Sequence, residues 1–354
     1  MIDMFVFDAH CDAPSQMLRL RDFSLDNCHA QVDFPKMKRG KVLASCFAFY
    51  IPADCPAPYG YAGKLRLETL RQLGLNAGVA AQASSSVQIE ENLRKDLLSI
   101  VFALENGSPI GDSFEKLQEF YDYGVRYVTL THSADNQICD SCTGGGTWGG
   151  LSPFGKKLVR EMNRIGMTVD LAHCSNDTVR DVLAITQEPV VYTHGACHSL
   201  CPHRRNLPDE LLKGIAQTGG VVGMSVYPLF LDQDFEKVLE DSGLPAEDWI
   251  ETEFIKDPSS VRKRLAWENL QDRLLALPRP GAGYMWRHLE HALKVCGAEH
   301  VGIGTDYDGI EITLSGMETI ENLGPMLEGL FKSHGCSDDL ASAVMSGNFM
   351  RILG

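Results

Sequence analysis

The chain has 354 residues, of which 44% are hydrophobic and 22% are charged. This composition is typical of a folded globular protein and excludes a disordered or low-complexity chain. The formal net charge of −15 argues against a nucleic-acid partner, because phosphate binding requires clustered lysine and arginine residues.

Targeting and membrane signals are absent from the sequence. No apolar run approaches the ~20 residues that a membrane-spanning helix needs. The first strand-like run follows Met1 so closely that no signal peptide fits before it, so we expect a cytoplasmic protein with no membrane partner. The 11 scattered cysteines suit reduced thiols in that compartment, and we interpret the Cys139–Cys142 C-x-x-C pair as a loop coincidence.

Eight short runs rich in β-branched and aromatic residues alternate along the chain with helix-like segments. The runs span residues 5–12, 42–51, 99–105, 125–132, 167–173, 189–194, 220–226 and 301–308. Between two of them, residues 153–165 have a proline near the start and apolar residues at helical spacing. The pattern predicts parallel βαβ units that close into an α/β fold of the (β/α)8 TIM-barrel type, with a doubly wound open sheet as the alternative.

The connection across residues 227–299 is too long for one helix and carries its own turn signals. We expect it to hold extra helices that cover the barrel mouth. No linker rich in Pro, Gly or Ser divides the chain, so residues 1–354 are predicted to form a single (β/α)8 domain with a helical excursion at about 227–299.

The first strand-like run ends in His10-Cys11-Asp12. Successive strand side chains point to opposite faces, so His10 and Asp12 should share one face, where an imidazole and a carboxylate can bind one cation. Taken alone, this pattern is more often a local hydrogen bond. Its interpretation therefore depends on the other strand ends.

Polar residues also close the later strands, at the carboxyl ends where (β/α)8 enzymes carry their active sites. With the first pair they are His10, Asp12, Glu105, His132, His173, His194 and Asp306. Any one of these histidines could be a buried structural residue, but their convergence favours a site for two divalent cations with a bridging carboxylate and an activated water. The run at 125–132 ends without a lysine that could be carbamylated, so we expect Glu105 to be the bridge.

The order of the motifs adds a resemblance to a known family. Along the chain stand His10-x-Asp12, Glu105-Asn-Gly, Thr131-His-Ser, Gly150-Leu-Ser-Pro-Phe-Gly, Val169-Asp-Leu-Ala-His-Cys-Ser, His194, Arg204-Arg-Asn-Leu-Pro-Asp and Gly304-Thr-Asp-Tyr-Asp-Gly. The series resembles the membrane (renal) dipeptidase family of zinc peptidases, here as a cytoplasmic-type member without a signal peptide. The resemblance runs from about residue 5 to 351, is weakest across 227–299, and implies a (β/α)8 homodimer that hydrolyses dipeptides with two zinc ions per chain.

The resemblance also implies a role for each candidate metal ligand. One zinc ion would be held by His10, Asp12 and Glu105. The other would be held by Glu105, His173 and His194. A water that bridges the two ions would then attack the amide carbonyl of a dipeptide.

Three further residues receive roles through the same resemblance. His132 would bind substrate and polarise the oxyanion, Asp306 would shuttle the proton, and Arg205 would clamp the substrate carboxylate with its planar guanidinium fork. The residues alone favour a solvated pair at a helix start for Arg204 and Arg205. Spacing alone also cannot choose between Asp306 and Asp308.

Alternatives to dipeptide hydrolysis stay open at this point. The same site could hydrolyse another small amide, such as an N-acyl amino acid or a β-lactam. A non-catalytic metal- or peptide-binding barrel has no need for both His132 and Asp306. A phosphoesterase is disfavoured because no cluster of basic residues is present to bind the phosphate. Asp8 and Asp170 precede candidate ligands on their strands and could orient imidazoles from behind.

Overall fold

A computed structural model describes residues 4–19, 21–244 and 260–354. Its strands are β1 (Val6–Cys11), β2 (Val42–Tyr50), β3 (Ala80–Gln82), β4 (Leu98–Glu105), β5 (Val125–Thr129), β6 (Thr168–Asp170), β7 (Val191–Gly195), β8 (Val221–Met224) and β9 (Val301–Ile303). All pair in parallel, and the sheet closes because β2 pairs with both β1 and β4 while β1 also pairs with β9. The short β3 lies beside the start of β4.

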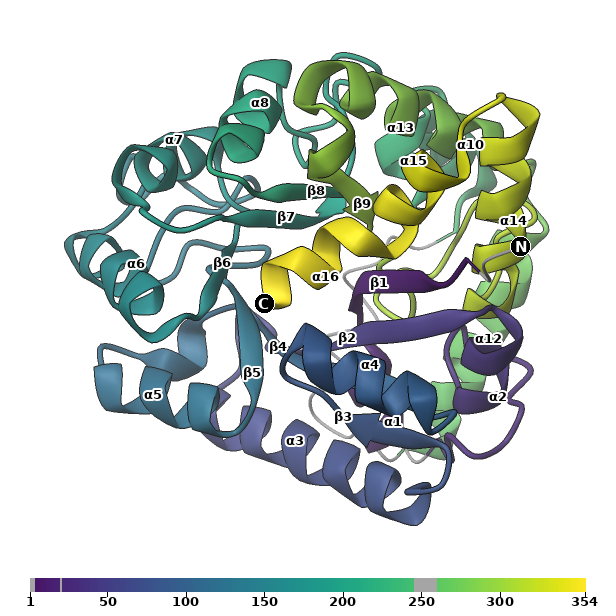
Figure 1. Ribbon diagram of the computed structural model, residues 1–354, viewed down its shortest axis with the longest axis horizontal. Helices are drawn as coiled ribbons and strands as arrows, with labels where there is room; N and C mark the ends of the chain where they lie inside the picture. Colours follow the sequence, from purple (N-terminus) through teal and green to yellow (C-terminus); the bar gives the residue numbers. More distant parts are fainter. Residues whose placement is uncertain (1–3, 20, 245–259) are drawn as a thin grey trace.

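The closed ring of eight parallel strands confirms the predicted (β/α)8 barrel, and the doubly wound alternative is wrong (Figure 1). Each of the eight expected strand-like runs overlaps one barrel strand. Except for β4, the strands are shorter than the runs, because several runs continue past the last ladder hydrogen bond into loops. Those loop residues carry much of the candidate site.

Helices surround the barrel. They are α1 (Ala13–Leu18), α2 (Phe34–Arg39), α3 (Pro58–Leu75), α4 (Ser86–Arg94), α5 (Phe114–Asp122), α6 (Pro153–Ile165), α7 (Asn176–Ile185), α8 (Asp209–Gln217), α9 (Pro228–Leu231), α10 (Phe235–Ser242), α12 (Val261–Leu275), α13 (Gly283–Cys296), α14 (Ile320–Ser333), α15 (Asp338–Ser342) and α16 (Asn348–Leu353). Within the described ranges, none of these helices is long and apolar enough to cross a membrane.

The helix at 153–165 shows why these segments start and stop where they do. Ser152 precedes α6, and its hydroxyl accepts a hydrogen bond from the Gly155 amide at 2.9 Å. Pro153 occupies the first helical position, where its missing amide hydrogen is not needed. Gly166 ends the helix with φ of 77°, a left-handed conformation that glycine adopts without steric cost.

Among the described residues between β8 and β9, the segment expected to form an excursion holds four helices. They are α9, α10, α12 and α13, and side chains of the first three reach the cavity above the barrel. The treatment of the whole chain as one domain stays a prediction.

The C-terminal helix closes the amino end of the barrel. Phe349 of α16 stacks on Phe7 of β1, with ring centroids 5.8 Å apart. A Cβ atom at Gly302 would come within 2.4 Å of the Phe349 ring, so glycine is required there for the close approach. The Asn348 side chain donates hydrogen bonds to the carbonyls of Ala298 and Val301 and fixes this helix under the strands. The amino end of the barrel is therefore covered by α16.

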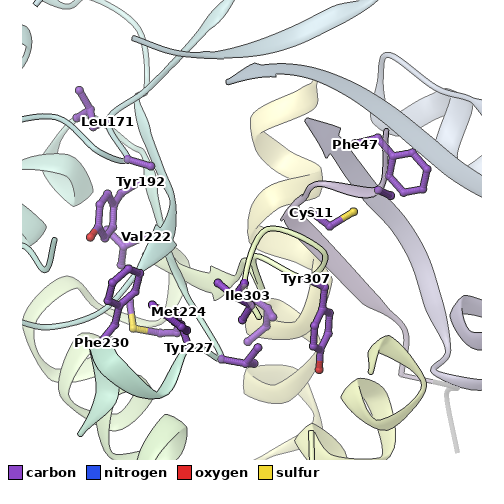
Figure 2. Packing of buried hydrophobic residues seen from close by; sticks show 14 of the residues in the cluster. Cys11, Phe47, Leu171, Tyr192, Val222, Met224, Tyr227, Phe230, Ile303 and Tyr307 are labelled. Carbon is purple, nitrogen blue, oxygen red and sulfur yellow. The ribbon is translucent and has the colours of Figure 1, made fainter. Parts of the chain in front are cut away.

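Aromatic packing continues up to the carboxyl end of the barrel (Figure 2). Tyr192 of β7 is fully buried, and Tyr227 packs edge to face on Phe230 with ring centroids 4.8 Å apart. Tyr227 and Phe230 also line the cavity. Part of the hydrophobic core therefore forms one wall of the candidate site.

Candidate metal centre

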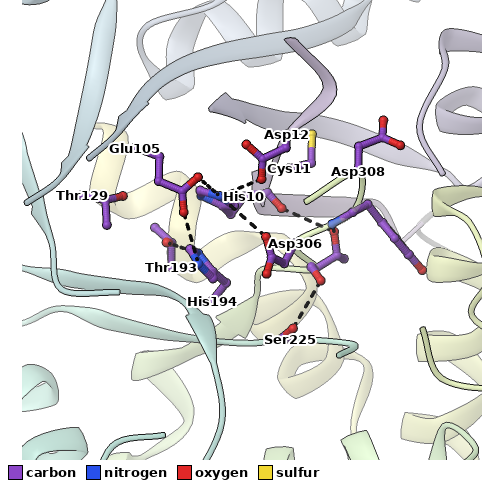
Figure 3. Close-up of polar contacts among 12 residues, drawn as sticks. His10, Cys11, Asp12, Glu105, Thr129, Thr193, His194, Ser225, Asp306 and Asp308 are labelled. Atoms are coloured by element: carbon purple, nitrogen blue, oxygen red, sulfur yellow. Dashed lines mark hydrogen bonds and ion pairs between the residues drawn. The ribbon is translucent and has the colours of Figure 1, made fainter. Parts of the chain in front are cut away.

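Glu105 lies at the centre of a cluster of imidazoles at the carboxyl ends of the strands. Its Oε1 atom is 3.1 Å from Nε2 of His173 and 3.7 Å from Nε2 of His194. Its Oε2 atom is 3.4 Å from Nε2 of His10 (Figure 3). One carboxylate therefore faces histidines on both of its oxygens, which is the arrangement that a bridging ligand needs.

His10 also faces two aspartates. Its Nε2 atom is 3.5 Å from Oδ2 of Asp12 and 3.9 Å from Oδ1 of Asp306. The strand alternation that predicted the His10–Asp12 pair is interrupted here, because the register of β1 shifts between Asp8 and Cys11 and Asp12 lies outside the strand. The two side chains converge all the same, since Asp12 leads directly into α1. Such irregularities often redirect side chains at active sites.

The second irregular strand end is at β7. Its register shifts between Tyr192 and Gly195, and His194 lies inside the shift. Nε2 of His194 is 2.9 Å from Nε2 of His173, whose backbone φ of 63° is in the left-handed region. A histidine in that conformation is uncommon and costs about 1 kcal/mol or more, and such strain gathers at functional sites.

Three overlapping groups of these residues could hold a metal ion, each with its ligand atoms within 4.8 Å of one another. The groups are His10, Glu105 and His194; Glu105, His132 and His173; and His10, Asp12 and Asp306. The predicted site residues are thus brought together in one place, although the geometric grouping places His194 with His10 rather than with His173.

His173 and His194, which face Oε1 of Glu105, are in the protonation state that binds metal ions. Burial lowers the pKa of His173 well below its usual value, and the positive charge of Arg205 lowers it further. Burial likewise lowers the pKa of His194. Both imidazoles are therefore neutral and carry a lone pair, the form that coordinates metals.

The other side of the cluster holds excess negative charge. Burial lowers the pKa of His10, but the charges of Glu105 and Asp12 more than offset this and raise the pKa well above its usual value. Burial raises the pKa of Asp306 well above its usual value, with the charge of His10 lowering it and those of Asp12 and Glu105 raising it. Carboxylates crowded in this way require compensating cations.

Buried polar atoms that lack a hydrogen-bond partner test whether this cluster fits a metal ion. Nε2 of His10 and Oδ1 of Asp12 are buried and have no hydrogen-bond partner among the described residues. Unsatisfied buried polar atoms are costly and rare in folded proteins. Two unpartnered ligand atoms, in a cluster of nitrogen and oxygen donors, fit divalent cations.

Asp170 and Thr193 support His194 from beneath. The Thr193 hydroxyl donates to Oδ2 of Asp170 at 2.7 Å and lies 3.0 Å from Nδ1 of His194. Asp170 also accepts from the Thr129 hydroxyl at 2.6 Å. The suggestion that Asp170 orients an imidazole therefore holds only through Thr193, which the sequence analysis missed. Its one signal was a polar residue directly before a candidate ligand in an apolar strand.

Asp8 has a different function from the one suggested. Its carboxylate accepts hydrogen bonds from the amide and hydroxyl of Thr305 at 2.9 and 3.0 Å, and from the Ser45 hydroxyl at 3.3 Å. It contacts His10 only through the backbone amide, at 3.4 Å. Asp8 therefore ties β1 and β2 to the loop that carries Asp306, rather than orienting an imidazole.

His132 is the most exposed of the four strand-end histidines, with 17% of its side chain accessible. Its ring packs against His173 at 4.0 Å and against Tyr50 at 4.7 Å between centroids. Its Nε2 atom is 3.9 Å from Glu105. A side chain beside the cluster but open to the cavity is suited to contact a substrate.

Arg205 is buried, so the interpretation of Arg204 and Arg205 as a solvated pair is wrong for Arg205, while Arg204 is exposed. The guanidinium of Arg205 donates to the Tyr192 hydroxyl and to the His194 carbonyl, each at 3.1 Å. The Tyr192 hydroxyl in turn donates to the Arg205 carbonyl at 2.6 Å. A Cβ atom at Gly195 would lie 1.9 Å from that hydroxyl, so glycine is needed for this arrangement.

Six of the predicted site residues line one cavity of about 440 Å³, a volume suited to a small-molecule ligand. Its lining includes Asp12, Glu105, His132, His173, Arg205 and Asp306, together with Tyr50, His203, Tyr227, Phe230, Trp267 and Asp308. The second group was not assigned to the site from sequence. His203 lies in a loop, and Tyr227, Phe230 and Trp267 lie in the 227–299 excursion, where no strand end marks them. Tyr50 ends β2 but is not a metal-ligand type, and Asp308 could not be separated from Asp306 by spacing.

The closed barrel, the candidate metal ligands at its carboxyl end and the cavity above them define a (β/α)8 protein of the metal-dependent hydrolase type. The chain belongs to the membrane dipeptidase family (peptidase family M19), whose model matches residues 1–354. The family expected from the sequence motifs is thereby confirmed.

Two curated relatives cover most of the chain. Dipeptidase aclJ of Aspergillus oryzae is 30% identical over 340 residues, which span 93% of this chain and 71% of that protein. An uncharacterized dipeptidase, C965.12 of Schizosaccharomyces pombe, is 27% identical over 372 residues, spanning 98% of this chain and 79% of its own length.

Solved structures share the fold. A metallopeptidase from Rhodobacter sphaeroides, liganded with a phosphinate mimic of the dipeptide L-Ala-D-Ala, has a TM-score of 0.80 at 22% identity and covers 99% of both chains. The probable dipeptidase PvdM from Pseudomonas aeruginosa has the same TM-score and identity and covers 99% of this chain and 95% of its own.

Proposed function

We propose that this metallopeptidase hydrolyses dipeptides with two divalent metal ions, zinc in the first instance, held around Glu105. The observation that carries the proposal is the placement of Glu105 between His10 on one oxygen and His173 and His194 on the other. Family membership supports the reaction class.

The residues divide into two sets of ligands in this proposal. His10, Asp12 and Glu105 would hold one ion, and Glu105, His173 and His194 the other. When bound, the ions would supply an activated water and polarise the amide carbonyl. The unpartnered atoms of His10 and Asp12 support the first set, and the neutral imidazoles of His173 and His194 support the second.

The remaining chemistry falls to side chains that line the cavity. His132, beside the cluster and open to the cavity, would hydrogen-bond to the developing oxyanion. Asp306 would accept a proton from the nucleophile and give it to the leaving amine, a task favoured by the raised pKa of a buried carboxyl group. Arg205 would bind the C-terminal carboxylate of the substrate.

Arg205 is well placed for that role. It is buried at the cavity wall, its two terminal nitrogens are anchored on Tyr192 and His194, and its Nε atom has no hydrogen-bond partner among the described residues. A guanidinium held in one orientation can bind a carboxylate with little loss of side-chain freedom. The liganded Rhodobacter relative supports a dipeptide as the substrate.

Three finer expectations belong to the same proposal. These are zinc as the bound metal, a homodimer as the assembly and the cytoplasm as the location. Each rests on the sequence resemblance or on the composition. Elemental analysis tests the first of them and sedimentation the second.

The decisive experiment for function combines metal content with turnover. The purified protein should contain about two metal ions per chain, lose dipeptide hydrolysis after chelation and recover it with zinc. A panel of dipeptides with L- and D-residues at the C-terminal position should be run beside N-acetyl amino acids and a β-lactam. Hydrolysis of only the last two classes would overturn the dipeptidase assignment.

A further inference from the structure

Asp308 presents an unpartnered carboxylate oxygen to the cavity. The residue follows Asp306 by two positions, lines the cavity and is only 7% exposed. Its Oδ1 atom accepts a hydrogen bond from the Gln31 amide at 3.1 Å. Its buried Oδ2 atom has no hydrogen-bond partner among the described residues. A buried carboxylate left in this state is costly unless a ligand satisfies it.

The loop that carries Asp308 is held in place by Gln31. The Asp308 amide donates to Oε1 of Gln31 at 2.6 Å, and Nε2 of Gln31 donates to the Ile310 carbonyl at 2.8 Å. Asp308 has φ of 64°, in the left-handed region. The unpartnered oxygen is therefore fixed on a preorganised loop rather than carried on a flexible one.

In the view of Figure 3, Asp308 lies away from His194, the residue whose carbonyl accepts a hydrogen bond from Arg205. Figure 3 shows His194 on one side of the Asp12 and Asp306 pair and Asp308 on the other. Arg205 belongs to the His194 side, because its guanidinium donates to the His194 carbonyl. A dipeptide is a zwitterion whose charged ends stand at most ~7 Å apart. With its carboxylate at Arg205, its ammonium group would point toward the Asp308 side.

Apart from Glu240 of α10, the other acidic residues that line the cavity have contacts or proposed roles elsewhere. Asp12, Glu105 and Asp306 have roles in the proposed reaction. Glu311 accepts a hydrogen bond from the Tyr227 hydroxyl at 3.1 Å. Glu236 of α10 lies within electrostatic range of His203, whose Nδ1 accepts from the Arg205 amide, so it belongs to the carboxylate side.

We propose that Asp308 binds the free α-ammonium group of the substrate through Oδ2 and thereby selects unblocked dipeptides over N-acyl amino acids. The inference rests on the proposed dipeptidase function and adds a specificity-determining residue to it. An N-acyl group presents no cation to Asp308 and would leave the buried oxygen unsatisfied.

The test compares two ligands that differ only in the amino group. Wild type and Asp308→Asn are assayed with the alanyl-alanine isomer that the wild type hydrolyses and with its desamino analogue, propionyl-alanine. Inhibition constants for a phosphinate dipeptide mimic, with and without its amino group, give the same comparison independently of turnover. Asn preserves the acceptor for the Gln31 amide, removes the negative charge and places an NH2 donor where the acceptor Oδ2 stood.

We expect Asp308→Asn to lower kcat/KM for the dipeptide ~10- to 100-fold, the usual effect of losing one charge-assisted hydrogen bond, and to leave the desamino analogue unchanged. The metal content should match that of the wild type. Asp308→Ala repeats the comparison if the Asn variant fails to fold. Glu240→Gln, which changes another cavity carboxylate on α10, should leave the ratio between the two ligands unchanged.

Equal losses for both ligands in Asp308→Asn would overturn the proposal and assign Asp308 a purely structural role. A loss confined to the amino-bearing ligand in Glu240→Gln would overturn it as well. Either result would leave the dipeptidase function standing. A wild-type protein that neither hydrolyses nor binds any dipeptide would instead overturn the proposed function itself.

Discussion

The Thr193 hydroxyl lies 3.0 Å from Nδ1 of His194 and donates its only hydrogen to Asp170. With that hydrogen committed, the hydroxyl can only accept from His194, so Nδ1 carries the proton of the neutral imidazole. The lone pair is then on Nε2, which faces His173 and Glu105. The strand beneath the site thus determines the tautomer that a metal requires.

Removing this hydroxyl should weaken metal binding. We expect Thr193→Val to lower metal affinity ~10- to 100-fold, because an outer hydrogen bond that orients a ligand has effects of that size. Competition with a chromophoric chelator measures the change directly, without reference to activity. Thr193→Ser keeps the hydroxyl and should retain the wild-type affinity. Equal affinity in the Val variant would show that His194 needs no such support.

Asp306 offers a way to separate proton transfer from metal binding. Asp306→Asn keeps the size of the side chain and removes its ability to accept and donate a proton. We expect kcat for dipeptides to fall by ~10²- to 10⁴-fold, the usual range for loss of a general acid-base group, while metal content stays at the wild-type level. Turnover and elemental analysis are read on the same preparation. Loss of metal together with activity would instead make Asp306 a ligand, as its place near His10 and Asp12 also allows.

His288 predicts a pH dependence of stability away from the site. Nδ1 of this buried residue accepts from the Cys197 amide at 3.1 Å, and Nε2 donates to the Leu231 carbonyl at 3.1 Å. Burial lowers its pKa to about 4, while the bond to Leu231 raises the pKa and the charges of Arg287 and His291 lower it. In the unfolded chain His288 therefore binds a proton near pH 6.5, whereas in the folded chain it binds one only near pH 4.

Stability should consequently decrease as the pH falls from about 6.5 to about 4, by at most about 3 kcal/mol from this residue. His288→Gln can keep both hydrogen bonds and cannot titrate, so its free energy of unfolding should depend less steeply on pH across that window. Urea unfolding at several pH values between 4 and 7 measures both slopes. Identical slopes in the two proteins would contradict the predicted contribution.

Much of the architecture could be predicted from the sequence because strand and helix signals are local. The eight strand-like runs and the helix at 153–165 each follow from nearby residues, and barrel closure follows from their number. The convergence of His10, Glu105, His173 and His194 could also be predicted, because parallel strands bring their carboxyl ends to one face. The direction of each side chain could not, since irregular register at β1 and β7 sets it.

Side-chain contacts between distant segments could not be predicted from the sequence, for a physical reason. Gln31 meets Asp308 across 277 residues, and Thr193 meets Asp170 across 23, through side chains that look unremarkable on their own strands and loops. The burial of Arg205 depends on Tyr192 and on Gly195, which lacks the Cβ atom that would block the tyrosine hydroxyl. Such features exist only after the strands are in register.

Gly309 shows how little space the site leaves between its carboxylates. A Cβ atom there would lie 2.3 Å from Oδ2 of Asp12 and 2.6 Å from Oδ1 of Asp306, far inside any permitted contact. Neither carboxylate can move freely, because Asp12 leads into α1 and the loop after Asp306 is tied to Gln31. Gly309→Ala should therefore displace the side chain of a proposed ligand, because the surrounding structure cannot accommodate the added methyl group.

We expect Gly309→Ala to lose at least one metal ion per chain and most dipeptide hydrolysis, with the barrel still folded by circular dichroism. Gly281→Ala is the matched control, because a Cβ atom there would meet nothing closer than the Ser315 carbonyl at 3.9 Å. That variant should keep the metal content of the wild type. Full metal occupancy in Gly309→Ala would mean that the Asp12 side chain can shift and still coordinate its proposed ion. That result would remove the steric argument for a fixed His10–Asp12 pair.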